Sequence, residues 1–160
     1  DNVRAGRPNA SDAEVLAALH AAQCDDIIAK FPDGVNTVVG KAGVYLSGGE
    51  RQRIVLARAI LKDAPIVVLD EATAFADPEN EALIQAALAT LCEDKTVLMI
   101  AHRLSTVVNA DRIFVINRGC VAEQGAHEEL VAQGGLYARM WRDYRTSATW
   151  RIEGGDSRVA

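Results

Sequence analysis

Short uninterrupted apolar runs alternate along the chain with longer segments of mixed apolar and polar residues. The runs at 66–70 and 96–101 predict strands that are buried on both faces, as in a parallel sheet. The longer segments contain strong helix formers and predict helices. They cover residues 12–24, 50–62, 79–91, 127–133 and 136–145, and a short helix is predicted at 104–110. This alternation predicts an α/β fold with a mostly parallel sheet.

Two serines mark the starts of predicted helices. Ser11 is followed three residues later by Glu14, and Ser47 is followed three residues later by Glu50. This spacing is that of a capping box, in which the serine and the acid each bind a backbone N–H at the helix start. The two helices are therefore predicted to begin directly after these serines.

Further along the chain, other local signals set boundaries. Asp77 precedes Pro78, which is the arrangement of an N-cap followed by proline at the first helical position. A third apolar run at 112–117 predicts another strand, and the turn at 118–119 joins it to 120–125. The last two segments are predicted to form a hairpin.

Two adjacent glycines, Gly48 and Gly49, follow Ser47 at the start of the predicted helix. Helix N-termini carry unpaired N–H groups and a partial positive charge, and glycines let an anion come close to the backbone. A phosphate site is one interpretation of this pattern. A serine cap with glycines that form a tight turn is the other.

Residues whose side chains can take part in catalysis or metal binding follow two of the predicted strands. Asp70 and Glu71 end the first of these strands, and His102 follows the second. Ligands of open parallel sheets bind at the carboxyl ends of the strands, so chemistry is expected there. Asp70 fits either a metal ligand or a cap of the following turn.

Composition and charge narrow the function classes. Hydrophobic residues make up 49% of the 160 residues and charged residues 24%, which is ordinary for a globular protein. The formal net charge is −5 and the basic residues are scattered, which argues against a nucleic-acid surface. Cys24, Cys92 and Cys120 lie far apart without metal-ligand spacing and are predicted to be buried reduced thiols. No apolar run approaches the roughly 20 residues of a membrane-spanning helix.

The motifs resemble, in type and in order, those of the ATP-binding cassette (ABC) ATPases. "LSGGERQR" is similar to the signature sequence of that family, and "IVVLDEAT" to its Walker B strand with the following glutamate. "AFAD" stands where the family has its D-loop, and His102 stands at its switch-histidine position. The opening "DNVRAGRP" and the segment before the signature resemble the helical subdomain of the exporter-type branch. The resemblance covers about residues 1 to 140.

The resemblance implies a role for each matching residue in Mg²⁺-dependent ATP hydrolysis. Asp70 would hold Mg²⁺, and Glu71 would act as general base or orient the attacking water. His102 would bind the terminal phosphate and help hold Glu71 and the water in line. Residues of the signature would bind ATP that is held by the opposite subunit, and Asp77 would bridge the interface. The signature residues are Ser47, Gly48, Gly49, Glu50 and Gln52.

A phosphate-binding P-loop of the form G-x-x-x-x-G-K-[ST] is not found in the sequence. "GVNTVVGKA" has one residue too many between its glycines, ends in alanine in place of a hydroxyl residue, and follows a turn. The predicted fold is therefore a partial P-loop NTPase-type sheet with a helical subdomain, lacking the P-loop half. Residues 1–45 would belong to the helical subdomain, 46–145 to the signature helix and the C-terminal part of the ATPase core, and 146–160 to a flexible tail. The isolated 160 residues are expected to be inactive.

The protein of which this chain is a part is expected to be an ABC transporter, with this domain at the cytoplasmic face of the cell membrane. Its partners would be a second nucleotide-binding domain and transmembrane domains, fused upstream or on another chain, with no nucleic acid. One alternative is an ABC-type ATPase of DNA repair or chromosome maintenance, against which the lack of sustained heptads and of a basic stripe argues. The other is a non-catalytic module that completes a partner's site, against which the presence of Glu71 and His102 argues.

Overall fold

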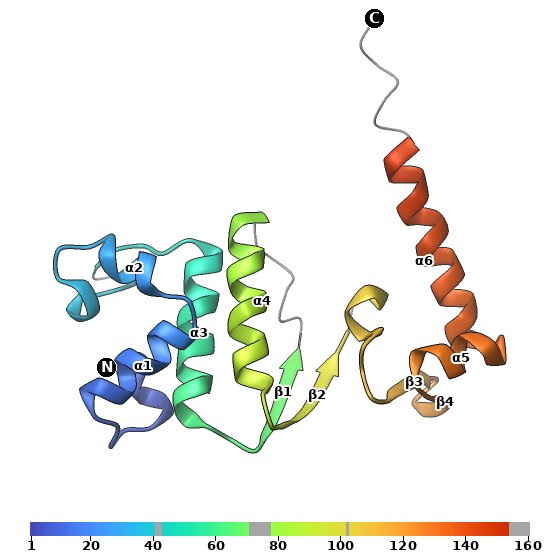
Figure 1. Ribbon diagram of the computed structural model, residues 1–160, viewed down its shortest axis with the longest axis horizontal. Helices are drawn as coiled ribbons and strands as arrows, with labels where there is room; N and C mark the ends of the chain where they lie inside the picture. Colours follow the sequence, from blue (N-terminus) through green and yellow to red (C-terminus); the bar gives the residue numbers. More distant parts are fainter. Residues whose placement is uncertain (41–42, 71–77, 102, 154–160) are drawn as a thin grey trace, which may run out of the picture. The chain divides into compact units, whose positions relative to one another are not determined.

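The computed structural model describes residues 1–40, 43–70, 78–101 and 103–153. The chain divides into two compact units, Asp1–Ile100 and Ala101–Ala160. Figure 1 shows the order of the elements. The first unit contains the helices around the signature sequence and a parallel strand pair, and the second contains a hairpin and two helices. Glu71, Asp77 and His102 lie outside the described residues.

The first unit opens with short helices that pack on one long helix. They are η1 (Arg4–Gly6), α1 (Asp12–Ala21), α2 (Asp25–Ala29) and η2 (Gly34–Asn36), and the long helix is α3 (Gly48–Lys62). Both predicted capping boxes are present, at Ser11 with Glu14 and at Ser47 with Glu50. Helix α3 ends at Lys62, as predicted, and Asp63 follows in the left-handed conformation that closes the helix.

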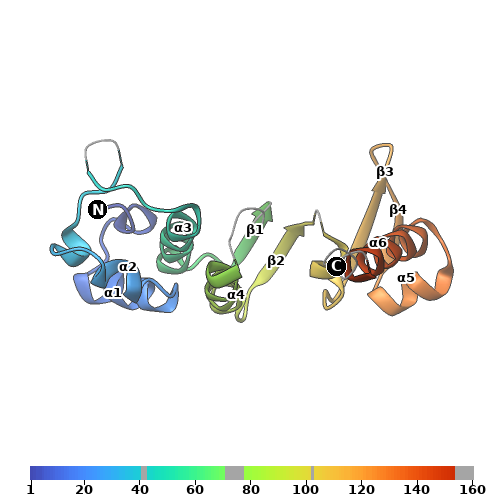
Figure 2. The same cartoon turned by 90° about the horizontal axis from the view of Figure 1, so that it is seen from above.

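Helix α4 (Pro78–Cys92) lies beside α3 in both views of the molecule, and it follows strand β1 (Ile66–Asp70) (Figures 1 and 2). It begins at Pro78, the proline that was expected at the first helical position. Strand β2 (Thr96–Ile100) pairs with β1 in parallel and in register, so that Ile66 lies opposite Thr96 and Asp70 opposite Ile100. The predicted parallel pair is confirmed.

The prediction that these strands are buried on both faces is wrong for this chain. Leu69 of β1 is buried in the core with Ile84 and Leu88 of α4. Ile66 and Val68, which point to the other face of the pleat, are 63% and 60% exposed. The helices of this unit cover one face of the pair, and no described element covers the other.

The second unit is built on an antiparallel hairpin. Its elements are η3 (Leu104–Val107), β3 (Ile113–Asn117), β4 (Cys120–Gly125), α5 (His127–Gln133) and α6 (Leu136–Glu153). Strand β3 pairs with β4, as predicted, with a register shift between Val115 and Ile116. Ile113 and Val115 alternate inward to pack with Leu130 and Tyr137. Helix α6 continues to Glu153, past the Arg145 at which the sequence pattern placed its end.

The segment that most resembles a P-loop has a different local structure. Gly34–Asn36 forms a 3-10 turn, and Val39 forms a single parallel bridge with Val44. Among the described residues, the next helix begins only at Gly48. The described residues of this segment differ from the strand–loop–helix arrangement of a P-loop, and Lys41 and Ala42 lie outside the described residues.

The three cysteines differ in environment, and one prediction about them is wrong. Cys24 is fully buried, Cys92 is half-buried and Cys120 is exposed at the start of β4, and all three are free. Burial raises the pKa of the Cys24 thiol to about 12, because the thiolate would lose its hydration. The expectation of buried thiols holds for Cys24 but fails for Cys120, which lies next to the hairpin turn.

Candidate functional site

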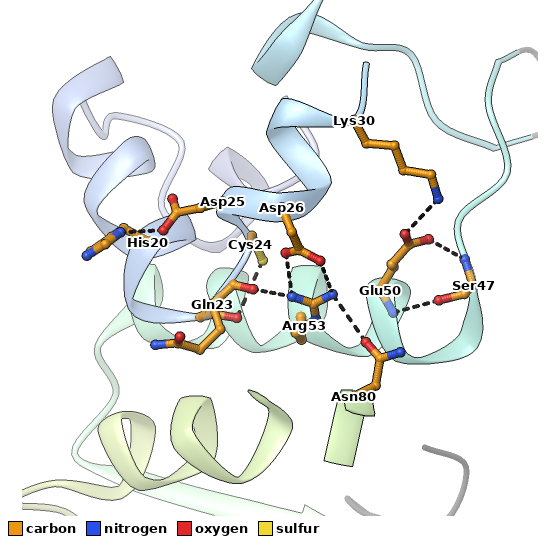
Figure 3. A network of polar contacts seen from close by, with 11 residues as sticks. His20, Gln23, Cys24, Asp25, Asp26, Lys30, Ser47, Glu50, Arg53 and Asn80 are labelled. Atoms are coloured by element: carbon orange, nitrogen blue, oxygen red, sulfur yellow. Dashed lines mark hydrogen bonds and ion pairs between the residues drawn. The ribbon is translucent and has the colours of Figure 1, made fainter. Parts of the chain in front are cut away.

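Ser47 and Glu50 hold the start of α3 in a reciprocal capping box (Figure 3). The Glu50 N–H donates to Ser47 Oγ at 3.2 Å, and the Ser47 N–H donates to Glu50 Oε2 at 2.6 Å. Ser47 has an extended backbone, with φ −62° and ψ 170°. The box therefore uses two of the unpaired N–H groups of the helix start for the protein's own structure.

The hydrogen-bond donors that remain at the start of α3 indicate what kind of ligand it can bind. No hydrogen bond from the N–H groups of Gly48 or Gly49 is found among the described residues. Ser47 Oγ accepts from Glu50, so its O–H hydrogen is free to donate elsewhere. Ser47 and Gly48 are exposed. Two N–H groups, a hydroxyl and the positive end of the helix dipole together form a set of donors suited to an oxygen anion.

Gly49 has a packing role that neither sequence interpretation anticipated. It is buried, and a β-carbon placed on it would lie 2.6 Å from the β-carbon of Asn80 in α4. Real side chains do not approach this closely, so glycine is needed here for α3 and α4 to meet at their starts. The two glycines thus have different roles: Gly48 lies on the exposed side, and Gly49 permits contact with α4.

Glu50 is largely buried and ionised. Its side chain is paired with Lys30, whose ammonium lies 2.9 Å from Glu50 Oε1, and the residue is 8% exposed. The hydrogen bond from Lys30, followed by the Ser47 N–H, lowers the pKa of the Glu50 carboxyl below its usual range. Sequence reasoning missed Lys30, which lies 20 residues from Glu50 with no motif to connect the two.

Arg53 is the largest fully buried side chain among the described residues and ties three elements together (Figure 3). Its guanidinium donates to both carboxylate oxygens of Asp26, at 2.6 and 2.8 Å, and to Asn80 Oδ1 at 3.2 Å. It also donates to the backbone carbonyl of Gln23. These contacts connect α2, α3 and α4 directly below the start of α3. Gln52, which the signature motif predicted to bind ATP, is half-buried.

Asp70 ends β1 at the carboxyl edge of the parallel pair, where a ligand was expected. It is exposed, and no described hydrogen bond or ion pair joins it to the start of α3. The contacts among the described residues therefore do not join Asp70 to the signature residues. An exposed carboxylate suits Mg²⁺, which often takes one or two protein carboxylates and completes its shell with water and phosphate oxygens. No cluster of three or more His, Cys, Asp or Glu side chains that could hold a metal occurs among the described residues.

Comparisons with known proteins agree with the motifs. Residues 4–74 match the family model described as ABC transporter. The chain is 54% identical over 142 residues to ATP-binding cassette sub-family B member 6 of Mus musculus, a match that covers 89% of this chain and 17% of that protein. It is 52% identical over 141 residues to the mycobactin import ATP-binding/permease protein IrtA of Mycobacterium tuberculosis, covering 88% of this chain and 16% of that protein.

A solved structure extends the likeness to the fold. The structure of a bacterial Atm1-family ABC exporter with ATP bound matches with a TM-score of 0.77 and 44% identity. The match covers 89% of this chain and 25% of that one. The chain thus spans about a quarter or less of the length of these proteins. Within the part of the chain that the structure describes, no helix is both long and apolar enough to cross a bilayer.

Proposed function

Because this chain belongs to the ABC transporter family, we propose that it forms part of an ATP-hydrolysing nucleotide-binding domain that powers transport across a membrane. In this proposal it supplies the signature helix, the Walker B strand and the segments that follow them. The P-loop that holds the nucleotide would come from a preceding part of the same domain. The domain would work at the cytoplasmic face of the membrane.

The observation that carries this proposal is the set of donors at the start of α3. The Ser47 hydroxyl and the N–H groups of Gly48 and Gly49 are the atoms that would bind the terminal phosphate of ATP. That ATP would be held by a second nucleotide-binding domain, and no hydrogen bond or ion pair among the described residues joins Asp70 to this helix start. Glu50 would support the donors through the capping box, and Gln52 would also contact the nucleotide.

The residues that follow the strands would act on a different nucleotide, the one that is bound by the domain to which this chain belongs. Asp70 would bind Mg²⁺, which when bound supplies positive charge to the phosphates. Glu71 would take a proton from the attacking water, or orient that water, and His102 would donate a hydrogen bond to the terminal phosphate. Asp77 would contact the second domain near both nucleotides. Transmembrane domains, fused upstream or on another chain, would couple closure of the two domains to transport.

Replacement of Glu71 by glutamine in the intact transporter tests the catalytic assignment. Because general-base catalysis contributes about 10²- to 10⁴-fold, hydrolysis of Mg·ATP is expected to fall by at least about 100-fold while ATP stays bound. Glu81→Gln, an exposed change on α4, is the matched control and should retain activity. If Glu71→Gln hydrolyses ATP at the rate of the control, the proposed catalytic role is wrong.

The 160 residues alone are proposed to bind ATP weakly and to hydrolyse none. A direct comparison of Mg·ATP turnover by this chain and by a version extended upstream through the P-loop tests this point. Turnover is expected only in the extended protein. Rapid Mg²⁺-dependent turnover by the 160-residue chain would refute the proposal that the phosphate cradle lies elsewhere.

A further inference from the structure

Glu50 carries out two tasks at the start of α3 with one carboxylate. Its Oε2 accepts from the Ser47 N–H at 2.6 Å and completes the capping box. Its Oε1 accepts from the Lys30 ammonium at 2.9 Å. Lys30 follows directly after α2, so the ion pair joins the end of one helix to the first turn of another (Figure 3).

Capping of α3 by Glu50 places a negative charge beside the proposed anion site, where it would repel a phosphate. The Glu50 side chain is only 11% exposed, so water screens its negative charge poorly. Its pKa is lowered, chiefly by the hydrogen bond from Lys30, and the carboxylate is therefore charged at neutral pH. A like charge in the first turn would oppose a phosphate that approaches Ser47 and Gly48. The capping box thus needs a nearby cation if the helix start is to attract anions.

We propose that Lys30 is a positioning residue of the nucleotide site: it neutralises Glu50, so that the carboxylate can cap α3 while the helix start keeps its attraction for the terminal phosphate. This inference rests on the proposed function, in which that phosphate belongs to ATP. Lys30 does not touch the phosphate in this account. It acts through Glu50, from a helix that is itself fixed in place.

Helix α2 is fixed by the buried guanidinium below it. Arg53, 1% exposed, holds both carboxylate oxygens of Asp26 in the first turn of α2. Arg53 and Glu50 lie three residues apart in α3, as neighbours on one helix face, while Asp26 and Lys30 lie four apart at the two ends of α2. Two parallel ion pairs therefore bind α2 to the start of α3, and the Arg53 pair brings Lys30 within reach of Glu50.

The test is a double-mutant cycle in the intact transporter, with Lys30→Met, Glu50→Gln and the two combined. Methionine keeps an unbranched apolar side chain without the charge, and glutamine at this position can still serve a capping box. Lys30→Met is expected to raise the KM for ATP by about two- to fivefold, the range given by charge effects at helix termini, with little change in kcat. In the double variant KM is expected to return to near the wild-type value, because the carboxylate and the cation that offsets it are then both absent.

Two further variants separate charge from structure. Lys30→Arg keeps the charge and should retain the KM of the wild type. Lys62→Met removes an exposed lysine at the opposite end of α3 and is the matched control, with KM expected to be unchanged. The KM effect of Lys30→Met should also shrink as the salt concentration rises, because Lys30 is half exposed.

The outcomes decide between this inference and the proposed function. If the wild-type transporter hydrolyses ATP and Lys30→Met leaves KM unchanged, the inference fails alone. It also fails if the double variant keeps the raised KM of Lys30→Met, since the effect would then not come from the uncompensated charge of Glu50. If the wild-type transporter itself shows no ATP hydrolysis, the proposed function fails and the inference with it.

Discussion

At Gly49 the backbone of α3 comes so close to α4 that the position has no room for a side chain. A β-carbon there would overlap Asn80 at 2.6 Å. Gly48, one residue earlier, is exposed. The two glycines of this motif therefore have different structural constraints: Gly49 must be small to pack against α4, whereas Gly48 faces solvent. Substitutions at the two positions should separate an effect on packing from an effect on ligand approach.

We predict that Gly49→Ala destabilises the chain and that Gly48→Ala does not. The alanine methyl at 49 must push α3 and α4 apart, at a cost of about 1–3 kcal/mol in the free energy of unfolding. Gly48→Ala should stay within about 0.5 kcal/mol of the wild type, as is usual for exposed positions. Denaturant unfolding followed by circular dichroism measures both. Equal stabilities for the two variants would show that the contact with Asn80 is not a close one.

The cysteine thiols offer a second prediction at the scale of the residue. Cys24 is buried with a pKa of about 12, whereas Cys120 is exposed. Since the thiolate is the reactive species, iodoacetamide at neutral pH should modify Cys120 rapidly and Cys24 only after unfolding. Mass spectrometry of the labelled chain gives the order of modification. In denaturant the two should react alike, and fast labelling of Cys24 in the folded chain would show that this thiol is not buried.

Between elements, the contact of Arg53 with Asp26 is the clearest tie of α2 to α3. The Arg53 side chain is 2% exposed, so loss of its partner leaves a charge with poor access to water. Asp25, the adjacent residue, pairs with His20 at 2.7 Å, with both side chains mostly exposed. These neighbouring acids form a matched pair for a stability test.

We predict that Asp26→Ala lowers the free energy of unfolding by about 2–4 kcal/mol. The value is set below the upper end for fully buried pairs because Asp26 itself is 58% exposed. Asp25→Ala should change it by no more than about 0.5 kcal/mol, as is common for exposed pairs. Denaturant unfolding of the two variants compares them directly. A similar small loss in both would mean that α2 is held by other contacts.

In the second unit, Glu123 of β4 caps the start of α6. Its carboxylate accepts from the Tyr137 N–H at 3.0 Å and from the Leu136 N–H. These two backbone hydrogen bonds lower the pKa of Glu123, in the order Tyr137 and then Leu136. The contact therefore adds stability above the usual carboxyl pKa of about 4.3 and loses it as the pH falls through the lowered value.

Glu123→Gln is predicted to weaken the acid dependence of α6. In the wild type, the helical signal of this unit should decline as acid protonates Glu123, and the variant should lose part of that decline because an amide does not titrate. Glu128→Gln, an exposed change in α5, should behave as the wild type. Circular dichroism as a function of pH compares the three. An identical acid transition in all of them would show that Glu123 does not control the start of α6.

Local signals predicted the elements well, and contacts between elements less well. The serine caps at 11 and 47 and the proline at 78 mark helix starts because they act on the nearest backbone groups. Burial of β1 on both faces was predicted from its apolar run alone, yet Val68 is 60% exposed. A run of apolar residues indicates what a strand can bury, but which element covers it depends on the rest of the fold.

Across the whole chain, some residues of the candidate site could be predicted from the sequence and others could not. Ser47, Gly48 and Asp70 could be named from their motifs, whose spacing is set by the chemistry of phosphate and metal binding. Lys30 and Arg53 could not, because their partners lie 20 and 27 residues away in sequence, in other helices. Such ion pairs leave no periodic signal. The residues that support a site are therefore harder to find from sequence than the residues that bind.

The start of α3 is proposed to bind the terminal phosphate of ATP that a second nucleotide-binding domain holds. The decisive test of this proposal is a structure of the intact transporter with ATP bound, in the state in which its two nucleotide-binding domains are closed. We predict that Ser47 Oγ and the Gly48 N–H lie within hydrogen-bond distance, about 2.7–3.2 Å, of the terminal phosphate held by the opposite domain. A closed, ATP-loaded structure in which Ser47 and Gly48 lie far from every phosphate would contradict the account.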